Sequence, residues 1–217
     1  MTGRTEAGSG ITSPSRLIRS LTLKSLNSFA MTITTRTATT GDERILHDLA
    51  ARTFGLACPP GTAQADIDTF IDTHLSVERF AGYLADPARI LVIVSGDEQP
   101  TGYAMLVRGP IADPDVAAVV DATTSIELSK FYLTAERHGS GAAGELMAAT
   151  LTAATGTGAR TCWLGVNQQN TRAARFYGRH GFAIVGVKRF LVGSEWHDDH
   201  IRQRDLSSPH GAGESGS

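Results

Sequence analysis

The sequence predicts a mixed α/β (α+β) fold with a central, twisted and mostly antiparallel sheet. Two apolar runs, Ile90–Val94 and Gly102–Val107, flank the turn-forming letters GDEQP and therefore predict an antiparallel hairpin. Further along, the strand-like Ile126–Leu133 and Thr161–Val166 enclose a helical segment, which predicts a parallel pair of strands joined by a helix. No internal repeat is visible, so the chain is not a series of repeated strand–helix–strand units. We expect about four helices to flank the sheet.

The elements before the parallel unit follow from local signals. Residues 32–37 alternate like a short strand, and Asp42 opens a helix whose apolar residues recur at helical spacing up to Gly55. Two short helical segments follow within residues 67–85. The second begins with Ser76 as its N-cap, and Pro87 ends it.

The later elements are marked by proline and glycine. The long connection over residues 109–125 predicts a short helix after Pro114. Glycines at 156 and 158 end the helix of the parallel unit, and a further helix runs from residue 171 until Gly181 breaks it. Residues 183–193 and 197–206 read as a terminal hairpin.

Composition excludes several classes of protein. The 217 residues are 41% hydrophobic and carry a net charge of only -2, which allows a globular core and gives no basic field for nucleic acid. No apolar run approaches the roughly 18–20 residues that span a bilayer, so no membrane contact is expected. Two cysteines make no disulfide framework, which indicates a soluble, reduced compartment, and we expect a cytoplasmic protein. We expect residues 1–30 to be a disordered extension, 31–206 the folded domain and 207–217 a flexible tail.

A glycine loop, RHGSGAAGELM, precedes the helix of the parallel unit. Its Gly139, Gly141 and Gly144 match the letters of a dinucleotide-binding loop. The N-terminus of the following helix offers unpaired N–H groups and a positive dipole end to a phosphate, although such a loop can also simply cap the helix. A dinucleotide site needs an acid about 20 residues further on, and the next acid after Glu145 is Glu195. A P-loop and a hydrolase elbow are excluded because their letters are missing.

A different stretch, NTRAARFYGRHGF, carries the other signal. On a helix, Asn170, Ala173, Ala174 and Tyr177 share one face, so a ligand can pack closely against the small residues with a tyrosine hydroxyl one turn beyond. The alternative is a helix that buries its alanines and stacks its aromatic rings in the core.

Together, YLTAERHGSGAAGELM and WLGVNQQNTRAARFYGRHGF closely resemble the acetyl-CoA-binding half of the GNAT superfamily of N-acetyltransferases. The former matches the family's Gln/Arg-x-x-Gly-x-Gly/Ala motif, with His138 in place of the usual Gln or Arg, and the latter matches Asn-x-x-Ala-x-x-Phe-Tyr. The resemblance covers most of the chain and implies a sheet whose parallel pair splays at the cofactor site. FLVGSEWHDDHI is similar to the closing hairpin of a bacterial branch that includes polyamine acetyltransferases.

The resemblance implies a set of cofactor contacts. The pyrophosphate of coenzyme A would lie on the backbone N–H groups of the loop, and the pantetheine amides would pair with the preceding strand like an extra strand. Asn170 would bind polar groups near the gap, beside Ala173. The implied cofactor-binding residues are Phe131, Leu133, Thr134, His138, Gly139, Ser140, Gly141, Ala142, Ala143, Asn170, Ala173 and Tyr177.

The implied reaction is direct acetyl transfer from acetyl-CoA to an amine. Tyr177 matches the family's acid and, with a phenol pKa near 10, would protonate the departing thiolate. Glu127 is the candidate base, and in an unbroken strand it lies on the same side as Ser129 and Phe131. The alternatives are an edge glutamate paired with Lys130 or an arginine, and a water relay.

The acceptor is left open by the sequence. It is a small-molecule amine, a polyamine or a peptide amine, walled by the helices from 63 to 84 and the loop from 109 to 124. Adjacent residues of a strand face opposite ways, so the terminal polar cluster predicts no metal site, and we expect none. That cluster comprises His197, Asp198, Asp199 and His200. An exposed edge of the terminal hairpin is suited to pairing two subunits as a homodimer. The alternative function is a non-catalytic CoA-binding regulatory module of the same fold.

Overall fold

The computed structural model describes residues 32–58, 61–135, 139–192 and 195–207, which fall within one compact unit, Met31–Ser217. The predicted extension 1–30 and the tail beyond residue 207 lie outside the described residues. The strands are β1 (Ile33–Thr37), β2 (Arg89–Gly96), β3 (Gln99–Val107), β4 (Ser125–Leu133), β5 (Thr161–Asn167), β6 (Ala183–Val192) and β7 (Glu195–Asp205). The helices are α1 (Glu43–Ala57), α2 (Gln64–His74), α3 (Val77–Ala85), α4 (Pro114–Ala117), α5 (Ala142–Gly156) and α6 (Thr171–Arg179).

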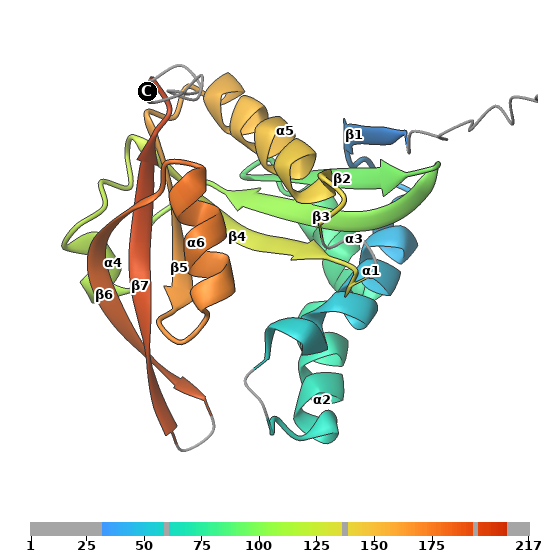
Figure 1. The fold of residues 1–217 in the computed structure, drawn as a ribbon, viewed down its shortest axis with the longest axis horizontal. Helices are drawn as coiled ribbons and strands as arrows, with labels where there is room; N and C mark the ends of the chain where they lie inside the picture. The colour runs from blue at the N-terminus through green and yellow to red at the C-terminus, as the bar shows by residue number, and fades with distance from the viewer. Residues whose placement is uncertain (1–31, 59–60, 136–138, 193–194, 208–217) are drawn as a thin grey trace, which may run out of the picture. The chain divides into compact units, whose positions relative to one another are not determined.

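The seven strands form a single sheet in the order β1-β2-β3-β4-β5-β7-β6 (Figure 1). Only β4 and β5 pair in parallel, and every other neighbouring pair in this sheet is antiparallel. The parallel pair is joined through α5, as the sequence predicts for a strand–helix–strand unit. The predicted mixed fold with a mostly antiparallel sheet is confirmed.

The local signals place the elements close to the predicted boundaries. Asp97 and Glu98 take positive φ values of 50° and 68°, the geometry of a tight turn between antiparallel strands, and so close the β2–β3 hairpin. Ser76 caps α3, because its side chain accepts a hydrogen bond from the Arg79 N–H at 3.3 Å. Asp42 precedes α1 without capping it, because its carboxylate is held by Arg36 in two hydrogen bonds of 2.7 Å.

Two hydrophobic cores lie on opposite faces of the sheet. On one face, α5 packs across β2 and β3 and buries Leu146, Met147 and Leu151 against the sheet. On the other, α1 and α3 bury Leu46 and Phe80 against the same strands. Alternate residues of each strand supply the two cores, which fixes the register of the sheet.

A smaller third cluster covers the far half of the sheet beside α4. Val116 and Val120 pack there on Trp163 of β5 and Ile201 of β7. Cys162 and Leu164 belong to the α5 core, so Trp163 faces the opposite side of β5 from α5. Among the described residues, no helix is both long and apolar enough to cross a membrane.

A β-bulge interrupts β4 and corrects one expectation. Met105 and Leu106 of β3 are opposite Lys130 and Leu128, so Ser129 is an extra residue in β4. Ile126 and Leu128 therefore belong to the α5 core, and after the bulge Phe131 and Leu133 do so. Glu127 was expected to share a side with Phe131 only in an unbroken strand, and the bulge shifts the alternation, so the two side chains lie on opposite faces.

The fully buried Leu146 of α5 gives a test of the packing. We expect Leu146→Ala to lower the free energy of unfolding by about 2–5 kcal/mol, because it removes buried methyl groups and leaves a cavity. Leu56→Ala on α1 makes the same chemical change at a side chain that is 57% exposed, and should change stability by less than about 0.5 kcal/mol. Urea unfolding of both variants measures this, and equal effects would contradict the arrangement of the α5 core.

Candidate active site

The site forms where the parallel strands β4 and β5 separate. Their pairing extends only from Ser125↔Thr161 to Glu127↔Trp163, although β4 continues to Leu133. The opposite edge of β4 stays paired with β3, and Figure 1 shows β4 and β5 running apart beyond the paired part. Among the described residues, no strand therefore pairs with the β5-facing edge of β4 between residues 129 and 133. Backbone N–H and C=O groups at such an edge can bind an extended ligand.

The glycine loop presents the start of α5. Gly139 and Gly141 have φ values of +84° and +90°, which favour glycine, and both are exposed. Gly141 is the N-cap residue and gives the helix no side-chain cap, while Ser140 reaches the Ala142 N–H only at 3.4 Å. First-turn N–H groups without a side-chain cap and the positive end of the helix dipole are a suitable set of donors for a phosphate. His138 lies outside the described residues.

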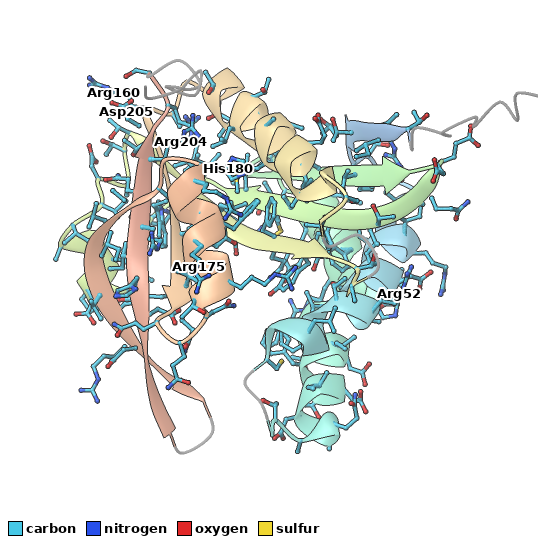
Figure 2. All side chains as sticks on the ribbon, in the orientation of Figure 1. Arg52, Arg160, Arg175, His180, Arg204 and Asp205 are labelled. Carbon is cyan, nitrogen blue, oxygen red and sulfur yellow. The ribbon has the colours of Figure 1, made fainter. Side chains whose placement is uncertain are left out.

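Helix α6 carries Tyr177 and is fixed at both ends. At its start, the Asn170 side-chain oxygen accepts a hydrogen bond from the Ala173 N–H at 3.0 Å. At its end, Arg204 of β7 donates to the carbonyl of His180, and Figure 2 shows both residues at the same end of α6. The oxygen of Asn170, predicted to contact the cofactor, thus also serves to cap the helix.

Aromatic contacts determine the position of the Tyr177 ring. Its centroid lies 6.2 Å from that of Phe131 on β4, 5.5 Å from Phe176 and 5.9 Å from Phe182. These edge-on contacts place the ring against the part of β4 that has left β5. Burial raises the pKa of the Tyr177 hydroxyl well above its ordinary value, and Tyr132 and Cys162 add to the shift. The phenol therefore keeps its proton throughout the neutral range.

Glu127 lines a pocket on the opposite face of the sheet. The pocket has a volume of about 290 Å³, near the lower end of the range for small-molecule sites. Glu127 and Trp163, the last pair before the strands separate, both line it. The remaining lining residues are Val107, Gly109, Pro110, Ile111, Ala112, Asp113, Val116, Ser125 and Lys188. The loop after β3 forms one wall of this pocket, whereas no residue of α2 or α3 lines it. That the loop and these helices wall an acceptor site stays a prediction.

Glu127 is half-buried, and several cations act on its carboxyl group. Burial raises its pKa above the ordinary value, and the attraction of Lys188, Lys130 and Arg89 partly offsets that rise, together with a hydrogen bond from Ser129. Glu127 lines the pocket at the last paired residue of β4, which is compatible with the alternative of an edge glutamate paired with Lys130 or an arginine. Its electrostatic partners do include Lys130 and an arginine, as that alternative supposed.

Cys162 interacts electrostatically with both candidate catalytic residues, Glu127 and Tyr177. Its thiol contributes to the raised pKa of Tyr177, while Glu127 contributes to the raised pKa of Cys162. Cys162 lies on β5 directly before Trp163, in the paired part of the strand. Tyr177 packs on the α5 core, whereas Glu127 lines the pocket with Val116 and Trp163 of the cluster on the other face. The two residues therefore approach the β4–β5 gap from opposite faces, which the sequence alone does not reveal.

Sequence reasoning missed the participation of Trp163 and Lys188 in the pocket. Trp163 reads as an ordinary apolar strand residue, and Lys188 lies on β6, an edge strand distant in sequence from β4. No local pattern could have identified Lys188, because only the strand order brings it near Glu127. In the terminal polar cluster, Asp198 is paired with Arg189 at 3.6 Å, and the side chains of Trp196 and His197 lie outside those described. The described side chains contain no group of three metal-ligating residues.

Comparisons with known proteins agree with this geometry. A family model described as the acetyltransferase (GNAT) family matches residues 50–182. An uncharacterised N-acetyltransferase of Mycobacterium tuberculosis is 45% identical over 158 residues, which cover 73% of this chain and 94% of the relative. The chain therefore belongs to the GNAT family of acetyltransferases.

Two solved structures show the same fold. The PaiA N-acetyltransferase from Thermoplasma acidophilum, in complex with coenzyme A, is 20% identical, with a TM-score of 0.63 over 81% of this chain and 99% of that one. The spermidine/spermine N-acetyltransferase SpeG from Vibrio cholerae is also 20% identical, with a TM-score of 0.55 over 81% and 93%. The predicted likeness to polyamine acetyltransferases is thus present at the level of the fold.

The left-handed conformation of Gly141 can be tested by substitution. We expect Gly141→Ala to lower the free energy of unfolding by about 1–2 kcal/mol, because a Cβ is strained at this φ. Gly144→Ala adds the same methyl group within α5, where a Cβ meets nothing within 4 Å, and should raise stability by about 0.5–1 kcal/mol. Thermal unfolding compares the two variants. The geometry of the loop would be contradicted if Gly141→Ala were neutral or stabilising.

Proposed function

We propose that this protein is an acetyl-CoA-dependent N-acetyltransferase that moves an acetyl group directly to a primary amine of a small molecule or peptide. The observation that carries the proposal is the separation of β4 from β5. The N-terminus of α5, which follows β4 in the chain, is suited to a phosphate, and the pocket at the last paired residues contains a carboxyl group. Membership of the acetyltransferase family supports it.

The residues around the gap fit coenzyme A. The N–H groups of residues 139–143 would hold the pyrophosphate at the start of α5. The main chain from Phe131 to Thr134, at the end of β4 and just beyond it, would pair with the amides of the pantetheine arm, because that edge of β4 has no strand partner among the described residues. Asn170 and Ala173 would line the gap from α6. Bound there, acetyl-CoA would supply an activated thioester.

Glu127 is proposed as the general base. An alkylamine with a pKa near 10 arrives protonated at neutral pH and must lose a proton before it can attack. The carboxyl group of Glu127 lies in the pocket at the last paired residue before the gap, where an amine reaching the thioester would pass. Its raised pKa makes the carboxylate a stronger base than an exposed glutamate.

Tyr177 is proposed as the acid that protonates the leaving thiolate. Its hydroxyl keeps its proton because burial raises the pKa well above the ordinary value. The ring is held against Phe131 on the separated part of β4, where the pantetheine arm would end. A group that stays protonated at neutral pH can donate that proton as negative charge develops on sulfur.

The first test of the proposed mechanism is Tyr177→Phe. We expect the rate of thiol release from acetyl-CoA to fall by about 10²-fold, because the variant lacks the proton donor. Calorimetry should show coenzyme A affinity within about threefold of the wild type, since the ring and its packing remain. Tyr103→Phe is the control, because its hydroxyl is also buried, lies in the core beside α1 and α3 and has no hydrogen-bond partner in the part of the chain that the structure describes. Full activity in Tyr177→Phe would show that the acid assignment is wrong.

The other test of the mechanism is the pH dependence of Glu127→Gln. We expect the wild-type rate to exceed that of the variant by about 10²-fold at pH 8, and the ratio to shrink as the pH falls through the pKa of Glu127. An exposed glutamate ionises near pH 4.3. Because burial raises the pKa of Glu127, the rate ratio should change at a pH above that value. Ionisation of the amine changes the rates of both enzymes by the same factor, so its effect cancels in the ratio of the two rates. Glu98→Gln, in the exposed β2–β3 turn, is the matched control.

A panel of polyamines, amino acids and peptides would identify the acceptor. Binding of coenzyme A without turnover across that panel would support the alternative of a non-catalytic CoA-binding module. A calorimetric titration without saturation by either acetylated or free coenzyme A would contradict both functions.

A further inference from the structure

Lys188 reaches the pocket from a distant strand. It lies on β6, opposite Asp199 of β7, and both β7 and β5 stand between β6 and β4 in the sheet. Even so, Lys188 lines the same pocket as Glu127 of β4. A lysine stem is long enough to extend across neighbouring strands while its ammonium group stays polar and hydrated.

Gly165 of β5 leaves room for this path. A Cβ placed on Gly165 would lie 2.9 Å from the Lys188 Cε and 3.4 Å from its Nζ, so the lysine stem occupies the space of the missing side chain. The backbone of Gly165 has no positive φ, and no backbone atom crowds that Cβ, so the chain conformation itself does not require glycine here. A glycine inside a strand weakens it and often marks a close approach of another group. The groups that approach here are the Lys188 side chain and, at 3.4 Å, the Asp199 Oδ2.

Several charged groups act on the carboxylate of Glu127, and Lys188 is one of them. Lys188, Lys130 and Arg89 all attract this carboxylate and favour the charged form. Arg89 is also paired with Asp86 at 2.9 Å, and Lys130 lies 5.9 Å from the centroid of the Tyr83 ring. The other titratable groups near this pair are Asp113 on the pocket wall, Cys162 on β5 and Asp199 beside Lys188.

We propose that Lys188, admitted through the space left by Gly165, is a positioning residue for Glu127 that holds its carboxylate ionised and directed into the pocket. The proposal rests on the proposed function, in which Glu127 is the base. Burial alone would favour the protonated carboxyl group, which cannot accept a proton from an amine. A cation that reaches the pocket from β6, with β7 and β5 between it and β4, favours the charged form of the carboxyl group.

The test measures the ionisation of Glu127 directly. The carboxyl carbons of ¹³C-labelled glutamate would be titrated by NMR in the full chain, and the Glu127 signal assigned by its loss in Glu127→Gln. We expect Lys188→Met to raise the apparent pKa of Glu127 by about one unit, because an opposite charge is removed. Lys188→Arg should restore the wild-type value. Gly165→Ala should raise it in the same direction, since its Cβ displaces the lysine stem and leaves the charge in the protein.

Arg189→Met is the matched control. Arg189 is the next cation on β6 and is paired with Asp198, so its removal should leave the titration of Glu127 unchanged. An unchanged pKa in a folded Lys188→Met variant would overturn the proposal. A shift in Lys188→Met with none in Gly165→Ala would overturn the path through Gly165.

The titration result can be distinguished from a failure of the proposed function. The titration needs neither acetyl-CoA nor turnover, so an inactive wild-type protein would refute the function without affecting the measured pKa values. In an active enzyme, Lys188→Met should also move the bend of the pH–rate profile upward by the same amount. A role for Lys188 in stability alone would lower the unfolding temperature and leave that bend in place.

Discussion

The loss of pairing between β4 and β5 after Glu127 and Trp163 is the constraint on which the site depends. Within a sheet, each backbone N–H and C=O group normally has a partner on the neighbouring strand, and a group that is buried without one destabilises the fold. Here β4 keeps its partner β3 on one edge and loses β5 on the other. The edge that β5 leaves must be satisfied by water or by a ligand with amide groups, and the pantetheine arm of coenzyme A has amides.

The bulge at Ser129 gives the two faces of the gap different chemistry. Before it, Glu127 faces the pocket, and after it, Phe131 faces α6. A regular strand would have placed both side chains on one face. The extra residue thus separates an aromatic wall, where Tyr177 keeps its proton, from a polar pocket, where a carboxyl group can exchange one. In the proposed mechanism, Glu127 and Tyr177 would lie on opposite sides of a bound thioester, which suits a reaction in which a proton leaves the amine and another reaches the sulfur.

Two glycines serve the site for different physical reasons. Gly141 is suited to its position by its backbone conformation. Its φ of +90° at the start of α5 would strain any residue that has a Cβ. Gly165 enters the proposal through its missing side chain, because a Cβ there would lie 2.9 Å from the Lys188 Cε. The role of Gly141 can be anticipated from a glycine-rich loop before a helix. Gly165 stands in an apolar strand with no local signal of its role, which becomes evident only when the position of the Lys188 side chain is known.

The sequence by itself determined the order of the elements, the parallel pair, the glycine loop and the family, because these follow from local periodicity, caps and contiguous motifs. It also selected Tyr177 and Glu127, but it could not assign them to faces. A bulge shifts the alternation by one residue and depends on how β4 pairs with β3, which no local pattern encodes. The approach of Lys188 was likewise decided only by the tertiary structure. It depends on the strand order β4-β5-β7-β6 and on the space above Gly165, both of which exist only once the sheet has assembled.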